Sequence, residues 1–85
     1  MKMKREVVAI TLARFRFKNK AHKAKVVLSV FNPGEKLTAQ EIVRRLRKRG
    51  YDINPKHLAM FIFYEMQHKY IRIEKDGKRC FYLLN

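Results

Sequence analysis

The sequence predicts an α+β fold of three helices followed by a C-terminal two-stranded hairpin, with an additional strand or helix at the N-terminus. Three observations predict it. Residues 38–49 carry start and stop signals at both ends of one helix, a second helix start follows within a few residues, and residues 70–84 form two strand patterns around Asp76-Gly77. A chain of 85 residues is long enough for one domain and too short for two. We therefore expect a single domain over residues 1–85, with an N-terminal extension at 1–20 and a core at 21–84.

The first helix is expected over residues 21–31. The sequence Asn32-Pro33-Gly34 follows and ends it, because proline cannot continue a helix and glycine favours a turn. The apolar residues that recur here at three- and four-residue spacing are Ala24, Val27, Leu28 and Phe31.

The second helix, over residues 38–49, has the strongest local signals. Thr38 and Glu41 have the spacing of a capping box, in which each side chain accepts a hydrogen bond from the other residue's backbone. Gly50 lies where a left-handed residue ends a helix. Around an apolar stripe, the surface of this helix is basic at Arg44, Arg45, Arg47 and Lys48.

The third helix is expected over residues 55–70. Asn54 is suited to cap it and Pro55 to occupy its first position, so the two helices are separated by a short turn. This is the helix-turn-helix arrangement. The helix should bury Leu58, Ile62 and Met66, with Ala59, Phe63 and Tyr70 on one flank. Its opposite face contains no acid and collects Lys56, His57, Met60, Tyr64, Gln67 and His68.

The hairpin is expected over residues 70–84, with Asp76-Gly77 as a type I′ turn. That turn would set Glu74 opposite Arg79, a stabilising pair, and Lys75 opposite Lys78, a repulsive one. An anion between the two lysines would relieve the repulsion. A slip of one residue would exchange these roles.

Residues 5–18 leave two alternatives. Their Val, Ile, Thr and Phe content favours a strand that pairs with a dimer partner or covers a sheet edge, but a helix stays open because the alternation is broken. The apolar part of this segment is short for a signal peptide, and no small-residue cleavage site follows it. We interpret it as part of a mature cytoplasmic protein.

The charge indicates a polyanionic partner. The chain has 21 Lys and Arg against 7 Asp and Glu, a formal net charge of +14. Such an imbalance makes the compact state repel itself, and it is typical of proteins that bind nucleic acid. An anionic membrane surface is the second candidate, although no apolar run is long enough to span a bilayer.

Catalysis and metal binding have little support in this sequence. The single cysteine, Cys80, is expected as a small core residue, and His57 and His68 are too far apart on one helix to share a metal. No nucleophile and base pattern and no phosphate-binding glycine loop occurs. We expect no enzyme activity, no cofactor and no small-molecule substrate.

Two segments carry a family resemblance. The sequence VLSVFNPGEKLTAQEIVRRL resembles the region joining the first two helices of winged helix-turn-helix DNA-binding domains, and YIRIEKDGKRCFYLL is similar to their wing. The resemblance covers residues 21–84. It implies a third helix, here 55–70, that enters the major groove and a hairpin, here 70–84, that touches the backbone or minor groove.

The expected function is therefore binding of double-stranded DNA, as a transcriptional regulator or a chromatin-type protein, by a nucleoid-associated homodimer. Two alternatives stay open: an RNA-binding ribosomal or ribonucleoprotein component, and a protein-interaction module in which Met60, Phe61 and Tyr64 contact another chain. The residues expected to contact DNA are Lys56, His57, Met60, Tyr64, Gln67 and His68 on the third helix, Arg44, Arg45, Arg47 and Lys48 on the second, and Lys75, Lys78 and Arg79 in the wing. For Arg79 an ion pair is an equal alternative.

Overall fold

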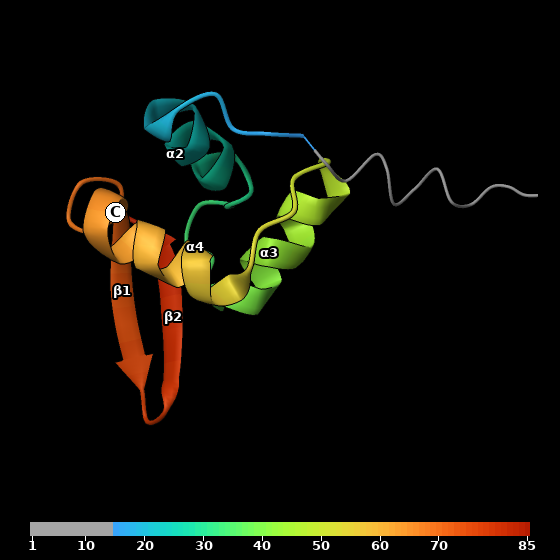
Figure 1. The fold of residues 1–85 in the computed structure, drawn as a ribbon. Coiled ribbons are helices and arrows are strands. Elements are labelled where there is room, and N and C mark those ends of the chain that lie inside the picture. Colours follow the sequence, from blue (N-terminus) through green and yellow to red (C-terminus); the bar gives the residue numbers. More distant parts are fainter. Residues whose placement is uncertain (1–14) are drawn as a thin grey trace, which may run out of the picture.

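Side-chain caps begin each of the three α-helices in residues 15–85, the part of the chain that the computed structural model describes. Figure 1 shows how these helices and the C-terminal hairpin are arranged. Helix α2 spans Lys20–Ser29, where the Asn19 side chain accepts from the backbone N–H of His22. Helix α3 spans Ala39–Lys48 and has the predicted capping box. In it the Glu41 N–H donates to Thr38 Oγ1 at 3.2 Å and the Thr38 N–H donates to Glu41 Oε1 at 2.9 Å. After α3, Gly50 has the predicted left-handed backbone, with φ of 94°.

The third helix is shorter than predicted and changes its geometry along its length. Helix α4 spans Pro55–Phe61 behind an Asn54 cap and continues as a single π-helical turn, η1, over Ile62–Met66. The Gln67 N–H donates to the Ile62 carbonyl at 2.8 Å, and Gln67 itself is extended, so the helix ends there rather than at residue 70. The prediction of a helix over 55–70 was wrong in its last turn.

The hairpin forms as predicted, but its turn is centred one residue later, so each residue of the first strand pairs two residues further along the second. Strand β1 spans Ile71–Asp76 and β2 spans Arg79–Leu84, antiparallel, with Asp76 opposite Arg79 and Lys75 opposite Cys80. The predicted Glu74–Arg79 and Lys75–Lys78 pairs do not form. The turn is centred on Gly77-Lys78, where only Gly77 has a positive φ, at 63°. A type II′ turn requires positive φ only at its first central residue, so glycine at that position selects this register.

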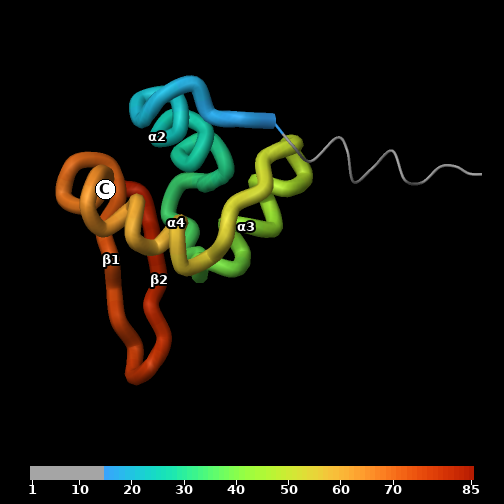
Figure 2. The backbone as a smooth tube through the Cα atoms, viewed as in Figure 1, coloured from blue at the N-terminus to red at the C-terminus, as the bar shows by residue number. Residues whose placement is uncertain are grey.

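A backbone link between residues far apart in the sequence attaches the hairpin to the helices. The Leu37 N–H donates to the Tyr82 carbonyl at 2.9 Å, and the Tyr82 N–H donates to the Leu37 carbonyl at 2.7 Å. Leu37 directly precedes the α3 cap. The link therefore fixes where α3 begins relative to the hairpin, and the tube in Figure 2 shows the α2–α3 connection passing beside β2.

The core lies between the helices and one face of the hairpin. Leu58, Ile62 and Met66 are completely buried, as predicted, whereas Phe63 and Tyr70, predicted on the flank of the same helix, are 55% and 48% exposed. The largest fully buried side chains are Leu37, Ile42, Leu46, Leu58, Ile62, Met66, Ile71 and Val27.

The predicted strand or helix at residues 5–18 and the extension at 1–20 lie mostly outside the described residues. At the point where the description begins, the Phe15 N–H donates to the Gly50 carbonyl at 2.8 Å. The Phe17 ring stacks on Tyr51 with 4.8 Å between centroids. In residues 15–85, none of the helices combines the length and apolarity that crossing a bilayer requires.

Candidate nucleic-acid interface

The outer face of α4 and η1 is open to solvent along most of its predicted length. Lys56, His57, Met60 and Tyr64 are exposed, the last two by 48% and 72%. The one acid in η1, Glu65, is ion-paired with Lys20 of α2 at 3.2 Å. The exposed face therefore combines cationic, imidazole, thioether and phenol groups with no carboxylate among them.

The last two residues predicted on this face lie in the turn after η1. His68 has a left-handed backbone with φ of 71°, and its carbonyl accepts from the Asn85 side chain at 3.2 Å. Gln67 is half-buried and still borders the same surface as Tyr64. The helix face thus contains four of the six predicted residues, and His68 belongs to the chain reversal.

A basic groove, which we call the tip groove, forms where the start of α3, the start of α4 and the end of the hairpin meet. Its volume is about 950 Å³. The only acid among its lining residues is Glu41, and the hydrogen bond from the Thr38 backbone holds the pKa of that carboxyl below its ordinary value. The cations that line the tip groove are Lys36, Arg44, Lys56, Lys78 and Arg79.

The cations of the tip groove differ in how far they are neutralised. Lys36 is ion-paired with Glu74 at 2.9 Å, whereas Arg79 lies opposite Asp76 in the hairpin register but forms no ion pair within residues 15–85. Within residues 15–85, Arg44, Lys56 and Lys78 form no ion pair. These three side chains come from three different elements, so the fold concentrates positive charge here that no single segment of sequence reveals.

A second groove, which we call the aromatic groove, separates η1 from the inner face of the hairpin. Its volume is about 530 Å³, and no acid lines it. Lys75 of β1 contributes to it, because side chains two residues apart share a face of a strand and Lys75 therefore lies on the same face as Ile73, opposite Cys80 of β2. The residues that line the aromatic groove are Ala59, Met60, Phe63, Tyr64, Gln67, Ile73, Lys75, Cys80 and Tyr82.

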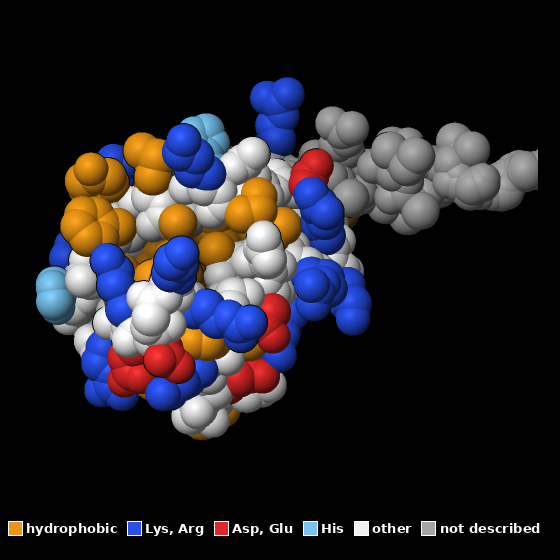
Figure 3. Space-filling model, turned by 90° about the horizontal axis from the view of Figure 1, so that it is seen from below, with side chains coloured by type: hydrophobic (Ala, Val, Ile, Leu, Met, Phe, Trp, Pro, Cys, Tyr) orange, Lys and Arg blue, Asp and Glu red, His pale blue; other side chains and the backbone are white. Residues whose placement is uncertain are grey.

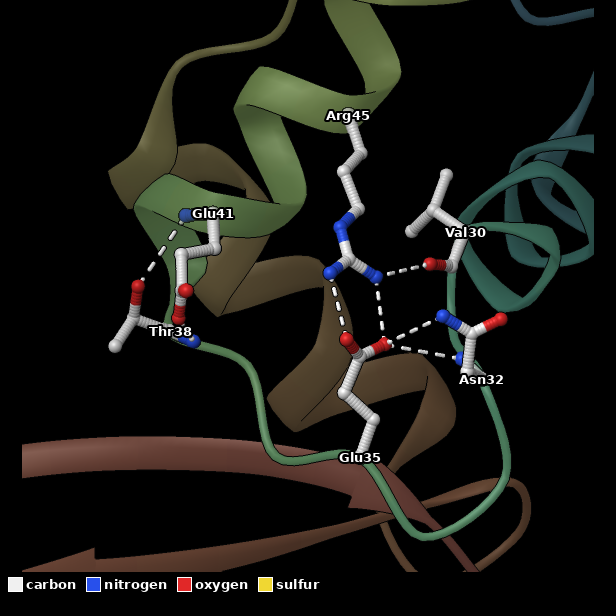
Figure 4. Close-up of polar contacts among 6 residues, drawn as sticks. All are labelled: Val30, Asn32, Glu35, Thr38, Glu41 and Arg45. Carbon is white, nitrogen blue, oxygen red and sulfur yellow. Dashed lines mark hydrogen bonds and ion pairs between the residues drawn. The ribbon is translucent and has the colours of Figure 1, made fainter.

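Arg45 is held in an internal ion pair. Its guanidinium donates to both carboxylate oxygens of Glu35 at 2.6 Å and to the Val30 carbonyl at 2.8 Å (Figure 4). The bonds from Arg45 to the carboxylate, with one from the Asn32 backbone, lower the pKa of Glu35 from 4.5 to about 2. The predicted phosphate ligand Arg45 therefore fastens α3 to the loop that follows α2.

The remaining basic residues of α3 lie away from the tip groove. Arg47 donates to Asp52 at 3.0 Å in a pair whose two side chains are about half exposed. Lys48 borders a hollow with Ser29 and Arg49 near the end of α2. Of the four predicted basic residues of α3, only Arg44 joins the tip groove.

Sequence reasoning missed Lys36 and Phe63 as surface residues of this region. Lys36 reaches the tip groove because its neighbour Leu37 pairs with β2, a long-range contact without a local sequence signal. Phe63 is exposed beside Tyr64, and their rings meet edge to face at 5.1 Å. Two consecutive large aromatics on an amphipathic helix were the available signal, because adjacent positions differ by about 100° and cannot share one narrow stripe.

Residues 15–85 contain no group of three His, Cys, Asp or Glu that could hold a metal ion. No protein-family model, no curated protein and no solved structure matches this chain.

Proposed function

We propose that this protein binds double-stranded DNA as a winged helix-turn-helix domain. The element order supports the assignment: three helices, of which the last two are joined by a short turn, and then an antiparallel hairpin. The pairing of Leu37 with Tyr82 supports it further, because it fixes the hairpin beside the start of α3. In this proposal α4 and η1 enter the major groove and the hairpin is the wing.

The observation that carries the proposal is the tip groove. Arg44, Lys56 and Lys78 converge on it from three elements and form no ion pair in residues 15–85. A protein that neutralises phosphates releases the counterions condensed on DNA, and this release supplies much of the binding free energy. Cations at the helix starts and at the hairpin tip would hold phosphates on either side of the inserted helix.

The exposed face of α4 supports a role in reading the sequence. A B-form major groove admits one α-helix and presents donors, acceptors and the thymine methyl on its base edges. His57 and Tyr64 can exchange hydrogen bonds with those edges, and Met60 can contact a methyl group. We assign phosphate contacts to the tip groove and base contacts to this face.

We extend the proposal to a nucleoid-associated regulator or chromatin-type protein that acts as a homodimer. A dimer would bind two half-sites about one helical turn apart, 10–10.5 base pairs centre to centre. Sedimentation of the purified protein with and without a duplex of about 20 base pairs, long enough for two half-sites, measures both stoichiometries.

The proposal is tested by the salt dependence of duplex binding. Fluorescence anisotropy with a blunt duplex of about 20 base pairs should give a log–log slope of about −0.9 per phosphate contacted, thus about −2.7 or steeper if Arg44, Lys56 and Lys78 each contact one phosphate. Lys78→Gln should make the slope shallower by about one contact for every sequence tested. A slope near zero would refute the electrostatic mechanism.

Two further comparisons test whether the protein reads the base sequence and whether it prefers DNA to RNA. Tyr64→Ala should change the preference among duplex sequences, whereas Lys78→Gln should weaken binding to all of them alike. An RNA duplex of the same length has a deep, narrow major groove that a helix cannot read, so it should bind more weakly than DNA. Tighter binding of RNA would favour the ribonucleoprotein alternative.

A further inference from the structure

The aromatic groove exposes more apolar surface than contact with duplex edges requires. Met60, Phe63 and Tyr64 are 48%, 55% and 72% exposed, and the two rings stand at 89° to one another. Figure 3, which views the molecule from the side of the hairpin tip, shows hydrophobic side chains gathered on one side with Lys and Arg side chains around them. Large exposed apolar patches on a small protein mark binding sites.

An intact duplex offers little to the faces of these rings. Stacked bases present their edges to the major groove, and the thymine methyl is the only apolar group there. An unpaired base, in contrast, presents a flat face on which aromatic side chains stack, whatever the base. The exposed ring faces therefore match an unpaired base better than a paired one.

The charges around the aromatic groove also favour an unpaired nucleotide as the ligand. No carboxylate lines the aromatic groove, and Lys75 stands in its wall on the inner face of β1. Cys80 lines both this groove and the tip groove, so the two are neighbours across β2. An occupant must combine flat apolar faces with a chain of negative charges, and an unpaired nucleotide does so.

We propose that the aromatic groove binds an unpaired nucleobase of DNA adjacent to duplex, with Tyr64 and Phe63 as the stacking residues and Lys75 holding a flanking phosphate. This inference rests on the proposed DNA-binding function and names the form of DNA that the site prefers. The side-chain amide of Gln67, at the end of η1, supplies a donor and an acceptor for the base edge.

The experiment compares two DNA probes that differ in one nucleotide. One is a blunt duplex of about 20 base pairs, and the other is the same duplex with a single unpaired 2-aminopurine bulge. The full-length protein should bind the bulged probe about tenfold more tightly, the size expected for stacking one base on an aromatic ring. The emission of 2-aminopurine should change at the same protein concentrations.

Matched variants identify the groove as the cause. Tyr64→Leu keeps an apolar side chain without a ring, so the preference for the bulge should fall by most of that factor, while Tyr64→Phe should retain it. A bulge also makes DNA easier to bend. If the preference persists in both Tyr64→Leu and Phe63→Leu, DNA deformability causes it and the inference is wrong.

The outcomes separate this inference from the function on which it rests. Equal affinity for the two probes refutes the inference and leaves duplex binding intact. Tight binding to the bulge without binding to the blunt duplex supports the inference and refutes the duplex proposal, and binding to neither refutes both. If Tyr64→Leu instead dissociates a dimer that shows no preference for the bulge, the groove holds a second copy of the chain and the inference is wrong.

Discussion

Arg44 and Arg45 are adjacent in α3, yet their surroundings are opposite. Arg45 donates to both oxygens of Glu35 and to the Val30 carbonyl, whereas Arg44 lines the tip groove and has no ion pair in residues 15–85. Adjacent side chains on a helix point about 100° apart. Arg45 can therefore contact the loop after α2 while Arg44 lines the open tip groove. Local charge density therefore does not tell which arginine is available to a ligand.

The acids of this chain account for the difference. Glu35 neutralises Arg45 from the loop after α2, and Asp52 pairs with Arg47 from the turn after α3. The first pair is bidentate and half-buried, whereas the second is largely exposed and contributes little. The two acids that pair with arginines of α3 thus lie away from the tip groove, which Glu41 alone of the acids lines.

The largest expected effect is the loss of DNA affinity when the exposed cations of the tip groove are replaced. Replacing Arg44, Lys56 and Lys78 together by Gln should lower the affinity for duplex DNA by about two to three orders of magnitude near 0.1 M salt, because three phosphate contacts are lost. Fluorescence anisotropy over a salt series measures both the affinity and its slope.

The control variant loses three positive charges at surface positions outside the tip groove. Arg16, Lys18 and Lys25 are exposed and lie on or before α2, at the end of the molecule away from the hairpin tip (Figure 1). Replacing these three by Gln should affect the affinity much less. Equal losses in the two triple variants would show that net charge, and not the tip groove, governs binding.

The next largest effect concerns Arg45 and its internal ion pair with Glu35. Arg45→Gln should lower the thermal midpoint of unfolding, because Glu35 and the Val30 carbonyl lose their partner. Its effect on DNA affinity, measured well below that midpoint, should stay within about twofold, because no phosphate contact is lost. A loss of affinity and slope equal to that of Arg44→Gln would place Arg45 in the binding site after all.

How far the sequence predicts this molecule depends on the range of the interactions involved. The caps at Thr38 and Asn54 were predictable because their partners lie two to three residues away. The hairpin was predictable in its position but not in its register, because Gly77 can serve as either central residue of a two-residue turn and one slip changes every pair. The π-helical turn η1 had no local signal that we recognised.

For the candidate site, the exposed face of α4 was predictable from periodicity alone. The tip groove was predictable only in its separate parts, because its cations are brought together by the long-range link between Leu37 and Tyr82. The ion pair that removes Arg45 from the binding surface was not predictable, since Glu35 and Arg45 are ten positions apart across a loop. Tertiary contacts decided which charges remain open.

The acid stability of the protein tests the internal ion pair further. The pKa of Glu35 is lowered from 4.5 to about 2 by its hydrogen bonds to Arg45 and the Asn32 backbone. A proton then binds the unfolded chain more tightly than the folded one, so this stabilisation is present above about pH 4.5 and is lost as the pH falls toward about 2.

Circular dichroism melting curves across that window measure the effect. In Glu35→Gln the thermal midpoint should be lower at neutral pH and should fall less on acidification than in the parent protein, because the titrating group is absent. Glu41 and Glu74 also have lowered pKa values, so the variant should retain part of the acid sensitivity. Parallel curves for parent and variant would contradict the assignment to Glu35.

The smallest expected effect lies at the point where the two regions meet. Thr38 caps α3 and borders the tip groove, and the cap fixes the start of the helix that carries both Arg44 and Arg45. Thr38→Ala removes the hydroxyl that accepts from the Glu41 N–H and should cost about 1 kcal/mol of unfolding free energy in urea denaturation. Thr38→Ser keeps that acceptor and should cost much less. Well below the midpoint, the salt slope of DNA binding should be unchanged in both variants, because the cap orders the helix without touching a phosphate. A shallower slope for Thr38→Ala at full folding would mean that this hydroxyl itself contacts the DNA backbone.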